Sequence, residues 1–442
     1  MTHPLDDIVR DWVTANVGEV RSFDRQHRWR PAWFVVASRA GRPVRLYARG
    51  DREGFGSMDV AREALILKVM EAHSIPVPHI HAEIGDGAVV VMDWLAGESN
   101  LGVVTDPGEI DAVMDDYVDA LVAVHRIDPQ AFGGLGMAVP ATREAMALDF
   151  FEGFVTRYRS FKRRPEPLLE FAIGWLRRNV PSRASRPSFV LGDSGQFMFE
   201  NRRITGLLDV ELAHIGDVAH DLAGLRLRGV TEPMGDLSRV LARYESVSGE
   251  PLDVAAIEFH TAKFALCTPL GLVAALHLDL TRPEILQYVE WFHQLSLHAI
   301  ESIARQAGVQ LEPVASPVST THEYTGVVRG LATMIEELDV AAGLAEYHRG
   351  TVASVARFCD RVNELHPAIV SADLDDIATL TGDRPVDRFA GDTVLEDFVR
   401  AAGPEHDANL ISLLHRRCMR QMLLLEPVLT APGGIGHLAA LT

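Results

Sequence analysis

The start of the chain combines one short helical pattern with strand-like segments. Residues 1–20 read as a short amphipathic helix. Residues 32–38 (AWFVVAS) and 44–49 (VRLYAR) are rich in β-branched and aromatic side chains, and Gly41 and Pro43 lie between them. Strand-favouring segments separated by turn residues predict a β-hairpin.

A helix and a second strand pair follow. In residues 57–73 apolar side chains recur at helical spacing, and the prolines at 76 and 78 predict the end of this helix. Two further strands are predicted around HIHAEIG and AVVVMDWL, joined by a turn at Gly85-Asp86-Gly87. The first 95 residues therefore predict a small, mainly β region.

From about residue 107 the pattern changes to long helices. They are predicted at 107–127, 141–160, 166–179, 232–248, 254–276 and 283–306. One strand-like island, residues 189–211, interrupts them, and 308–320 resembles a linker before a second helical stretch at 321–428. We therefore predict an α+β fold with four parts: 1–95 as an N-terminal nucleotide-binding lobe, 96–307 as a helical lobe, 308–320 as a linker and 321–442 as an all-helical domain.

Composition narrows the class of protein. The net charge of −19 disfavours general binding to nucleic acid and to anionic membranes. No apolar run approaches the roughly 20 residues that span a bilayer, and the start MTHPLDDIVRDW lacks a secretion signal. The chain has only three cysteines, Cys267, Cys359 and Cys418, which we expect to be buried free thiols. Such sparse cysteines are typical of a reducing compartment, so we expect the protein in the cytoplasm. Only Lys68, Lys162 and Lys263 are lysines, so arginine must supply nearly every functional cation.

The island at 189–211 places two carboxylates at the ends of a predicted hairpin. Asp193 precedes an apolar arm at 196–199, and Asp209 follows a second apolar arm at 204–208. Buried arms fix the separation of two such carboxylates. Phosphoryl transfer uses a pair of this kind, one to accept the proton of the attacking hydroxyl and one to hold Mg²⁺ against the phosphates.

This segment resembles the aminoglycoside-phosphotransferase and choline-kinase superfamily. The likeness rests on Gly192-Asp193, on Asp209 with Glu211, and on Gly216-Asp217 followed by Asp221-Leu222-Ala223. It covers roughly residues 20–305 and implies a two-lobed, protein-kinase-like fold that uses ATP and Mg²⁺ to phosphorylate a hydroxyl of a small molecule. It further implies that Asp193 is the catalytic base, that Asp209 is a metal ligand and that Asp221 braces the catalytic loop.

Two departures from the family pattern concern the catalytic loop. Leu191 stands where the family has a histidine, and the loop is two residues short. The resemblance implies a metal-binding asparagine in this loop, and Gln196 is the residue that best fills its place. Its longer side chain would compensate for the shorter loop. The match of Gly192-Asp193-Ser194-Gly195 to a serine-protease motif is set aside, because a helix-rich chain offers no scaffold for that chemistry.

The nucleotide side of the site lacks two expected features. The family's strand lysine is replaced by Arg49, with Arg52 as the alternative, and Glu63 matches its helix partner. Arginine can hold phosphate oxygens through two N–H groups. No glycine-rich loop is present. In its place residues 25–31 carry several arginines, which either clamp phosphates, bind an anionic acceptor or lie on a solvated face.

A hinge is predicted between the two lobes. Met92 would line the adenine pocket, while the carbonyl of Asp93 and the amide of Leu95 would pair with the adenine edge. For Trp94, packing and ligand contact are both open, and His125 is expected to be a core residue.

The acceptor and the role of the C-terminal region stay open. Candidate acceptors include aminoglycosides, amino alcohols, sugars and hydroxyacyl-CoA thioesters. Residues 406–428 carry an apolar stripe that looks wider than one core needs, which predicts an exposed face and a homodimer, with a lid over the acceptor site as the alternative. A catalytically weak, nucleotide-binding regulator is the second hypothesis for the whole chain.

Overall fold

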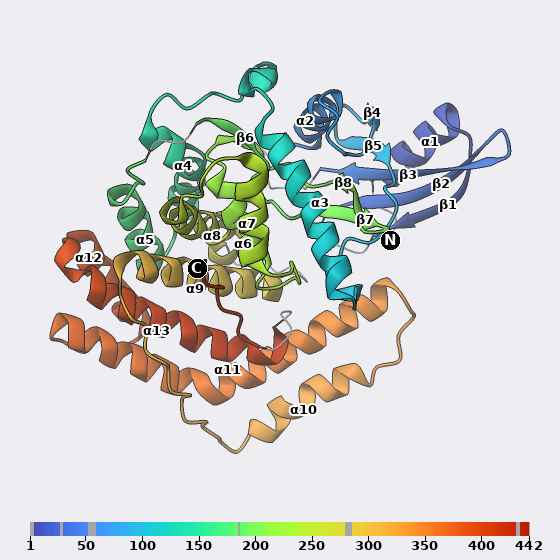
Figure 1. Cartoon of the computed structure of the whole chain (residues 1–442). Coiled ribbons are helices and arrows are strands. Elements are labelled where there is room, and N and C mark those ends of the chain that lie inside the picture. Colours follow the sequence, from blue (N-terminus) through green and yellow to red (C-terminus); the bar gives the residue numbers. More distant parts are fainter. Residues whose placement is uncertain are drawn as a thin grey trace. The chain divides into compact units, whose positions relative to one another are not determined.

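The structure is a computed structural model of the chain, shown in Figure 1. It describes residues 4–26, 30–51, 59–183, 186–278, 285–429 and 434–441. The chain divides into two compact units. The N-terminal unit comprises Met1–Thr142, Ser185–Leu252 and Leu441–Thr442, and the helical unit comprises Arg143–Ala184 and Asp253–Ala440.

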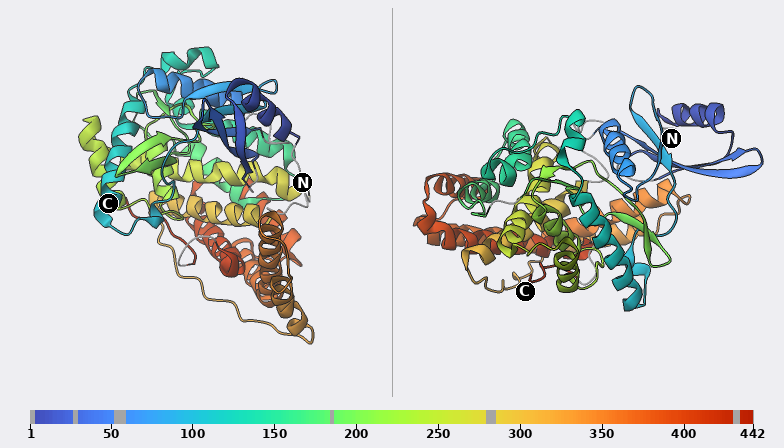
Figure 2. Two further views of the ribbon diagram at one scale, coloured as in Figure 1. Left: turned by 90° about the vertical axis from the view of Figure 1, so that its right-hand side faces the viewer. Right: turned by 45° about the horizontal axis from the view of Figure 1, so that its top comes forward.

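An antiparallel sheet forms the first part of the N-terminal unit. Its strand order in the described residues is β1 (Glu19–Arg25), β2 (Ala32–Arg39), β3 (Arg42–Gly50), β5 (Val89–Asp93) and β4 (Ile80–Ile84). The sheet is coloured blue in Figures 1 and 2. Helix α1 (Asp6–Asn16) buries Val9 and Val13 against Trp33 and Val35 on one face of it. Because side chains alternate along a strand, Tyr47 and Arg49 lie on the other face.

The remaining elements of the N-terminal unit carry the predicted carboxylates. β6 (Ser188–Val190) pairs with β9 (His214–Gly216), and β7 (Phe197–Glu200) pairs with β8 (Arg203–Leu207). The helices are α2 (Val60–Ala72), α3 (Pro107–His125), α6 (Ala219–Arg228) and α7 (Leu237–Ser248), with 3-10 turns η1 (Leu101–Val103) and η2 (Pro129–Leu135). The predicted α+β class is confirmed, and the strands of the predicted hairpin match β7 and β8 to within a residue.

The helical unit is built from helices that are far apart in the sequence. It contains α4 (Arg143–Phe161), α5 (Pro167–Arg178), α8 (Val254–His277), α9 (Ile285–Ala307), α10 (Thr325–Glu336), α11 (Leu344–Thr381), α12 (Arg388–Ala401) and α13 (Asp407–Leu425), with η3 (Pro404–His406) and η4 (Glu426–Val428). Residues beyond 320 thus share one compact unit with α4, α5, α8 and α9. Helix α8 is long and apolar enough to cross a membrane, but 72% of its most apolar stretch is buried within the protein.

The expectation that α13 exposes an apolar face is wrong. Its apolar residues, including Ile411, Leu414 and Met422, are buried. Helices α9 and α11 both pack against α13, as the contacts between them and Figure 1 show. The stripe is wide because it fills two interfaces within one unit. The cysteine expectation also needs correction, since Cys267 and Cys418 are buried but Cys359 is exposed.

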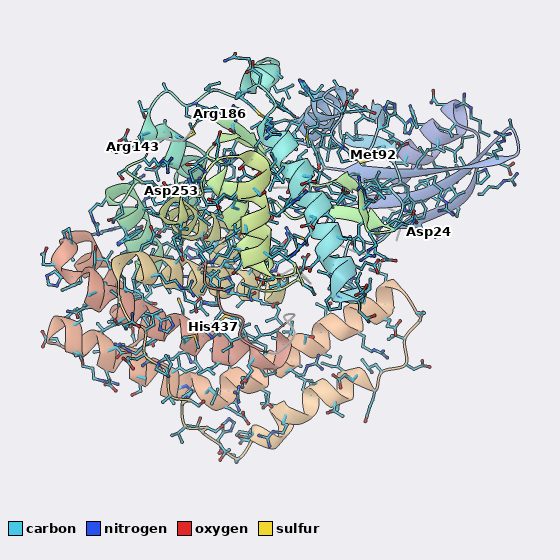
Figure 3. All side chains as sticks on the ribbon, viewed as in Figure 1. Asp24, Met92, Arg143, Arg186, Asp253 and His437 are labelled. Atoms are coloured by element: carbon cyan, nitrogen blue, oxygen red, sulfur yellow. The ribbon has the colours of Figure 1, made fainter. Side chains whose placement is uncertain are left out.

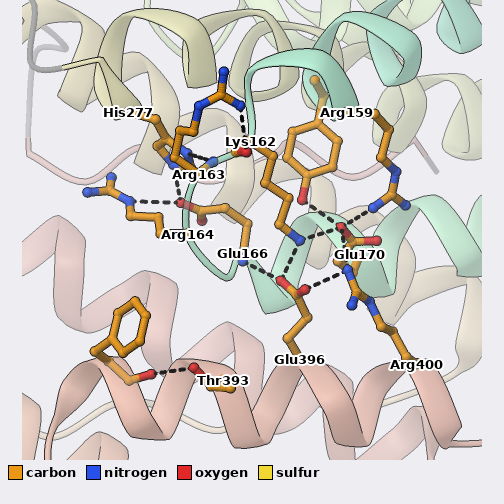
Figure 4. A network of polar contacts seen from close by, with 12 residues as sticks. Arg159, Lys162, Arg163, Arg164, Glu166, Glu170, His277, Thr393, Glu396 and Arg400 are labelled. Atoms are coloured by element: carbon orange, nitrogen blue, oxygen red, sulfur yellow. Dashed lines mark hydrogen bonds and ion pairs between the residues drawn. The ribbon is translucent and has the colours of Figure 1, made fainter.

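A network of charges ties α12 to α5 (Figure 4). Lys162 Nζ lies 2.6 Å from Glu170 Oε1 on α5 and 2.6 Å from Glu396 Oε2 on α12. Burial works against the negative charge of Glu170, but hydrogen bonds from Arg159, Lys162 and Tyr158 outweigh it and lower the pKa of that carboxyl to about 2. The helices after residue 320 are therefore joined to α5 by charged contacts as well as by apolar packing.

Candidate functional site

The loop between β6 and β7 presents Asp193. Its backbone takes left-handed conformations at Gly192 (φ 84°) and Gly195 (φ 88°), which glycine adopts without steric cost. A Cβ atom at Gly192 would lie 2.3 Å from the carbonyl oxygen of Leu212. The loop is therefore a tight, sequence-specified turn that fixes where Asp193 points.

Asp221 on α6 holds this loop from behind. Its carboxylate is fully buried and accepts hydrogen bonds from the backbone amides of Leu191 (2.8 Å) and Gly192 (2.9 Å). His125 Nε2 lies 3.0 Å from the same carboxylate, and His125 Nδ1 lies 2.8 Å from the hydroxyl of Tyr244. His125 is thus a buried structural residue that links α3, α6 and α7.

Two side chains that the sequence analysis did not single out support the loop from other elements. The hydroxyl of Tyr117 accepts a hydrogen bond from the amide of Gly195 (2.7 Å), and Arg228 Nε donates to the carbonyl of Ser194 (3.1 Å). Ser194 Oγ donates to the backbone carbonyl of Asp221, so it is a turn residue and not a free nucleophile. Only the structure could identify Tyr117 and Arg228, because each lies tens of residues away from the loop in sequence.

Asp193 lies between a cation and an amide. Arg228 Nη2 is 2.6 Å from Asp193 Oδ1, and Gln196 Nε2 donates to Asp193 Oδ2 (2.7 Å). Burial raises the pKa of Asp193; Arg228 opposes this shift, whereas Asp209 and Glu211 add to it through their negative charge. Asp193 and Asp209 therefore lie close enough for their charges to interact, as the predicted hairpin required.

Arg49 on β3 joins the predicted site residues of three elements. Its Nη1 lies 3.1 Å from Glu63 Oε1 on α2, and its Nη2 lies 2.6 Å from Asp209 Oδ1 just after β8. The same Nη2 lies 3.4 Å from Glu211 Oε2. The pairing of Arg49 with Glu63 is the one predicted from the family pattern. The contact with Asp209 was not predicted.

This cluster brings carboxylates and guanidinium groups together. Glu63, Asp209 and Glu211 face Arg49 and Arg30, and Arg30 pairs with Glu211 and lies 3.7 Å from Glu63. Burial raises the pKa of Glu63 to about 7, with Arg49 and Arg30 opposing and the neighbouring carboxylates reinforcing that rise. Burial works against the charge of Arg49, but the three carboxylates outweigh it and raise its pKa.

Of the options for residues 25–31, a solvated face does not hold for Arg30. It is only 2% exposed and belongs to the carboxylate cluster. Residues 27–29 of that run, and the alternative cation Arg52, lie outside the described residues. Lys68 is half-exposed on α2 and pairs with Glu83, as expected for a surface residue.

The predicted hinge follows β5. Met92, labelled in Figure 3, is buried on that strand. The backbone amide of Asp93 donates to the carbonyl of His79, and the Asp93 carboxylate lies 2.7 Å from His81 Nε2. The Leu95 side chain lies against Gly206 of β8, where a Cβ atom would meet it at 2.5 Å.

An aromatic group lies on the face of the sheet that carries Arg49. The ring of Phe34 is 4.6 Å from that of Trp94 and 5.1 Å from that of Tyr47. Tyr47 is two residues from Arg49 on β3, so both side chains point to the same side. The period-two spacing of Tyr47 and Arg49 was visible in the sequence, but the approach of Trp94 from the hinge was not.

The donor set around Asp209 fits a magnesium ion bound with nucleotide. Carboxylate and amide oxygens are the ligands that Mg²⁺ prefers, and it is usually held by one or two carboxylates together with substrate phosphates. The described residues contain no group of three or more His, Cys, Asp and Glu side chains placed to hold a metal by themselves.

Comparisons with solved structures agree with this geometry. A candidate aminoglycoside phosphotransferase from Ralstonia eutropha aligns with a TM-score of 0.52 at 18% identity, covering 68% of this chain and 97% of that chain. A thermostable mutant of aminoglycoside phosphotransferase APH(4)-Ia, in ternary complex with ADP and hygromycin B, aligns with a TM-score of 0.51 at 13% identity, covering 68% and 99%. At these identities the likeness shows the fold.

Another thermostable mutant of APH(4)-Ia, in ternary complex with AMP-PNP and hygromycin B, gives a TM-score of 0.52 at 15% identity, with 68% of this chain and 99% of that chain covered. Among curated proteins no significant match is found. The family model described as "Phosphotransferase enzyme family" matches residues 28–257, which is more than half of the 442 residues and includes every predicted site residue. The chain therefore belongs to the phosphotransferase enzyme family.

Proposed function

We propose that this protein transfers the γ-phosphate of ATP to a hydroxyl group of a small molecule, with Asp193 as the base and Asp209 as a metal ligand. The observation that carries the proposal is the convergence of Asp193, Asp209 and Arg49 from three separate elements. Membership of the phosphotransferase family supports the reaction class. The similar structures with ADP or AMP-PNP support ATP as the donor.

Asp193 has the chemistry needed for a base. Arg228 and Gln196 hold its carboxylate in one position. A carboxylate fixed in this way can orient an incoming hydroxyl group and accept its proton. Its raised pKa brings the carboxylate closer to the basicity that proton abstraction near neutral pH requires. The positive charge of Arg228 opposes that rise in pKa.

Arg49 would serve the nucleotide. A guanidinium held between Glu63 and Asp209 can turn one edge to phosphate oxygens while Glu63 keeps it in place. Asp209 and Gln196 are the residues that would hold Mg²⁺. Mg²⁺, when bound, would neutralise charge on the β- and γ-phosphates.

The base of the nucleotide would lie against the face that carries Arg49. The Leu95 amide makes no hydrogen bond among the described residues and can donate to an adenine nitrogen, with the Asp93 carbonyl as the matching acceptor. Phe34 and Tyr47 offer flat apolar surface on the same side of the sheet as Arg49. We expect the cytoplasm, where ATP is abundant, to be the compartment.

One observation favours a second function, a nucleotide-binding regulator with weak catalysis. Asp209 is engaged by Arg49 at 2.6 Å, so metal binding has to break a buried ion pair. The two functions differ in a simple assay: both bind Mg-ATP, but only the enzyme produces an acceptor with one added phosphate when it is incubated with ATP and a panel of hydroxylated metabolites, aminoglycosides and hydroxyacyl-CoA thioesters.

Asp193→Asn should lower turnover of the acceptor found in that panel by about 10²–10⁴-fold, because the amide cannot accept the proton. The dissociation constant for ADP should change by no more than about twofold, whereas a tenfold change would correspond to about 1.4 kcal/mol of binding free energy. Asp86→Asn, on an exposed turn, is the matched control and should retain full turnover. Equal rates for Asp193→Asn and the control would remove Asp193 from the mechanism.

Arg49→Met should weaken ADP binding by about 10–100-fold, since a charge-assisted hydrogen bond contributes about 1.5–3 kcal/mol. Arg42→Met, which removes an exposed arginine from the start of the same strand, should bind ADP like the parent protein. Titration calorimetry measures both, with the melting temperature as a check on folding. An unchanged dissociation constant for Arg49→Met would contradict the role of Arg49.

Arg228→Met should move the acid limb of the kcat/KM profile to higher pH. Burial raises the pKa of Asp193 and Arg228 lowers it, so without Arg228 the carboxylate is lost at a higher pH as the solution is acidified. Arg239→Met, a surface variant, should leave the limb where it is in the parent enzyme. A limb that does not move in Arg228→Met would show that another group sets it.

The proposed homodimer needs a different surface from the one expected. Tyr324, Val327, Leu331, Met334 and Leu338 are 45–73% exposed and recur every three or four residues along α10 and its ends. Helix α11, which packs against α10, also carries exposed apolar side chains, among them Val352 and Cys359. Figure 1 shows α10 running beside the first half of α11.

The exposed apolar side chains of α10 suit a second copy of the chain, because contiguous apolar surface of this kind marks interaction sites. Apolar stripes at a spacing of three and four residues match one another when two helical hairpins pack antiparallel.

Leu331→Glu should convert a dimer to a monomer by placing a charge within the interface, whereas Val386→Glu, on an exposed residue outside the stripe, should leave the dimer intact. Light scattering at micromolar concentration measures the mass of both variants. A parent protein that is monomeric under the same conditions would end this proposal.

A further inference from the structure

The helical unit contains a cavity of about 840 Å³. It is lined by residues of α5, α8, α9, α11, α12 and α13 and by the segment just before α5. No residue proposed for phosphoryl transfer lines it. Its volume falls in the range of roughly 300–1,000 Å³ that is typical of small-molecule sites.

One wall of the cavity is apolar. Leu276 at the end of α8 and Ile285, Val289 and Phe292 on α9 line this wall, and the cavity has more apolar than polar lining. A wall of this kind favours a hydrocarbon body, because burying apolar surface is favourable by roughly 25 cal/mol for each Å².

Another wall, from α12 and α13, is rich in hydrogen-bond donors. Arg417 is only 7% exposed, and its Nη1 has no hydrogen-bond partner in the described part of the chain. The Nε2 atom of Gln421, one helical turn further along α13, is likewise buried without a partner there. Arg388 donates through Nε to Asp392 (3.0 Å) and through Nη1 to Asp373 (2.7 Å).

The acceptors around the cavity are already engaged. Asp392 accepts from Arg388 and Arg417, and Glu166 contacts His277 (2.8 Å) and Arg164 (3.4 Å). The cavity therefore offers donors in excess of acceptors. A buried donor without a hydrogen-bond partner destabilises the protein. A ligand whose oxygens accept hydrogen bonds from these donors removes that cost and so gains binding free energy.

The local field also favours an anion. Burial, together with the charges of Arg388 and Arg164, lowers the pKa of His293, which lines the cavity, to about 3. His293 is therefore neutral at pH 7, in a field that disfavours any added positive charge. Arg388 and Arg164 contribute positive charge to the cavity wall, which is the sign that attracts an anion.

We propose that this cavity binds an amphipathic organic anion, with its apolar body on α8 and α9 and a carboxylate or phosphate head on Arg388, Arg417 and Gln421. The cavity brings together residues from before and after position 320. A ligand there would stabilise the packing of α12 and α13 on the rest of the helical unit.

Calorimetric titration of the full chain with decanoate, decyl phosphate, decan-1-ol and acetate tests the proposal. Decanoate, decyl phosphate or both should bind saturably, whereas decan-1-ol lacks the charged head and acetate lacks the apolar body, so each should bind at least about tenfold more weakly. A preference between the two anions identifies the head group. Absence of saturable binding by either anion up to roughly millimolar concentration, or equal binding of decan-1-ol, overturns the proposal.

Two variants with a matched control locate the site. Val289→Trp fills the cavity without touching an ion pair, and Arg388→Met removes the head-group contact, so each should weaken the binding of the anion by at least about tenfold. Arg384→Met, an exposed arginine outside the cavity, should bind like the parent protein. Unchanged binding by Val289→Trp would place the anion elsewhere. The readout needs no phosphotransferase activity, so its failure leaves the proposed function untouched.

Discussion

The buried contact of Arg49 with Glu63 and Asp209 is the interaction on which the site depends. It joins a strand of the sheet, a helix beside it and the end of the β7–β8 hairpin through one guanidinium. Removing either partner from such a group leaves a buried charge without compensation, which is strongly destabilising. The contact therefore fixes the positions of Glu63 and Asp209 relative to the sheet, and it leaves a cation where the phosphates of a nucleotide are expected.

Arginine changes the behaviour of this position compared with lysine. A lysine that is buried among changing charges can lose its proton, whereas arginine keeps its charge under all conditions relevant to proteins. Its planar group also has enough donors to contact Glu63 and Asp209 at once. In a chain with only three lysines, a site of this type can keep a permanent positive charge. Asp209, the proposed metal ligand, would then have to exchange partners before it could hold Mg²⁺.

Much of the candidate site could be predicted from the sequence because its residues lie on strongly patterned segments. The apolar arms around Asn201 and Arg202 predicted β7 and β8, and the order of Asp209, Glu211 and Asp221 placed the carboxylates. Strand β1 was missed because its residues are only half-buried or exposed on an edge strand and carry no clear alternation of apolar positions. Helix α6 was not among the predicted helices because its buried polar residues, such as His220 and Arg226, are accommodated only by tertiary contacts.

The packing of the C-terminal helices could not be predicted from the sequence. Their helical nature followed from periodicity, but which of their faces are buried did not, because α13 packs against both α9 and α11 and so has no single solvent face. The cavity lined by Arg417 and Gln421 could not be inferred from the sequence either, since it depends on helices more than a hundred residues apart. The proposed phosphoryl transfer and the proposed anion site rest on different residues in different units.

The most direct test of the central claim is a crystal structure of the protein with AMP-PNP and Mn²⁺, using the anomalous signal of manganese to locate the ion. The account predicts a manganese peak bound by Asp209 and by nucleotide phosphate, with Arg49 still on Glu63 but turned from Asp209 to a phosphate oxygen. Nucleotide bound elsewhere, or bound with Arg49 still paired to Asp209 and no metal beside it, would contradict the account.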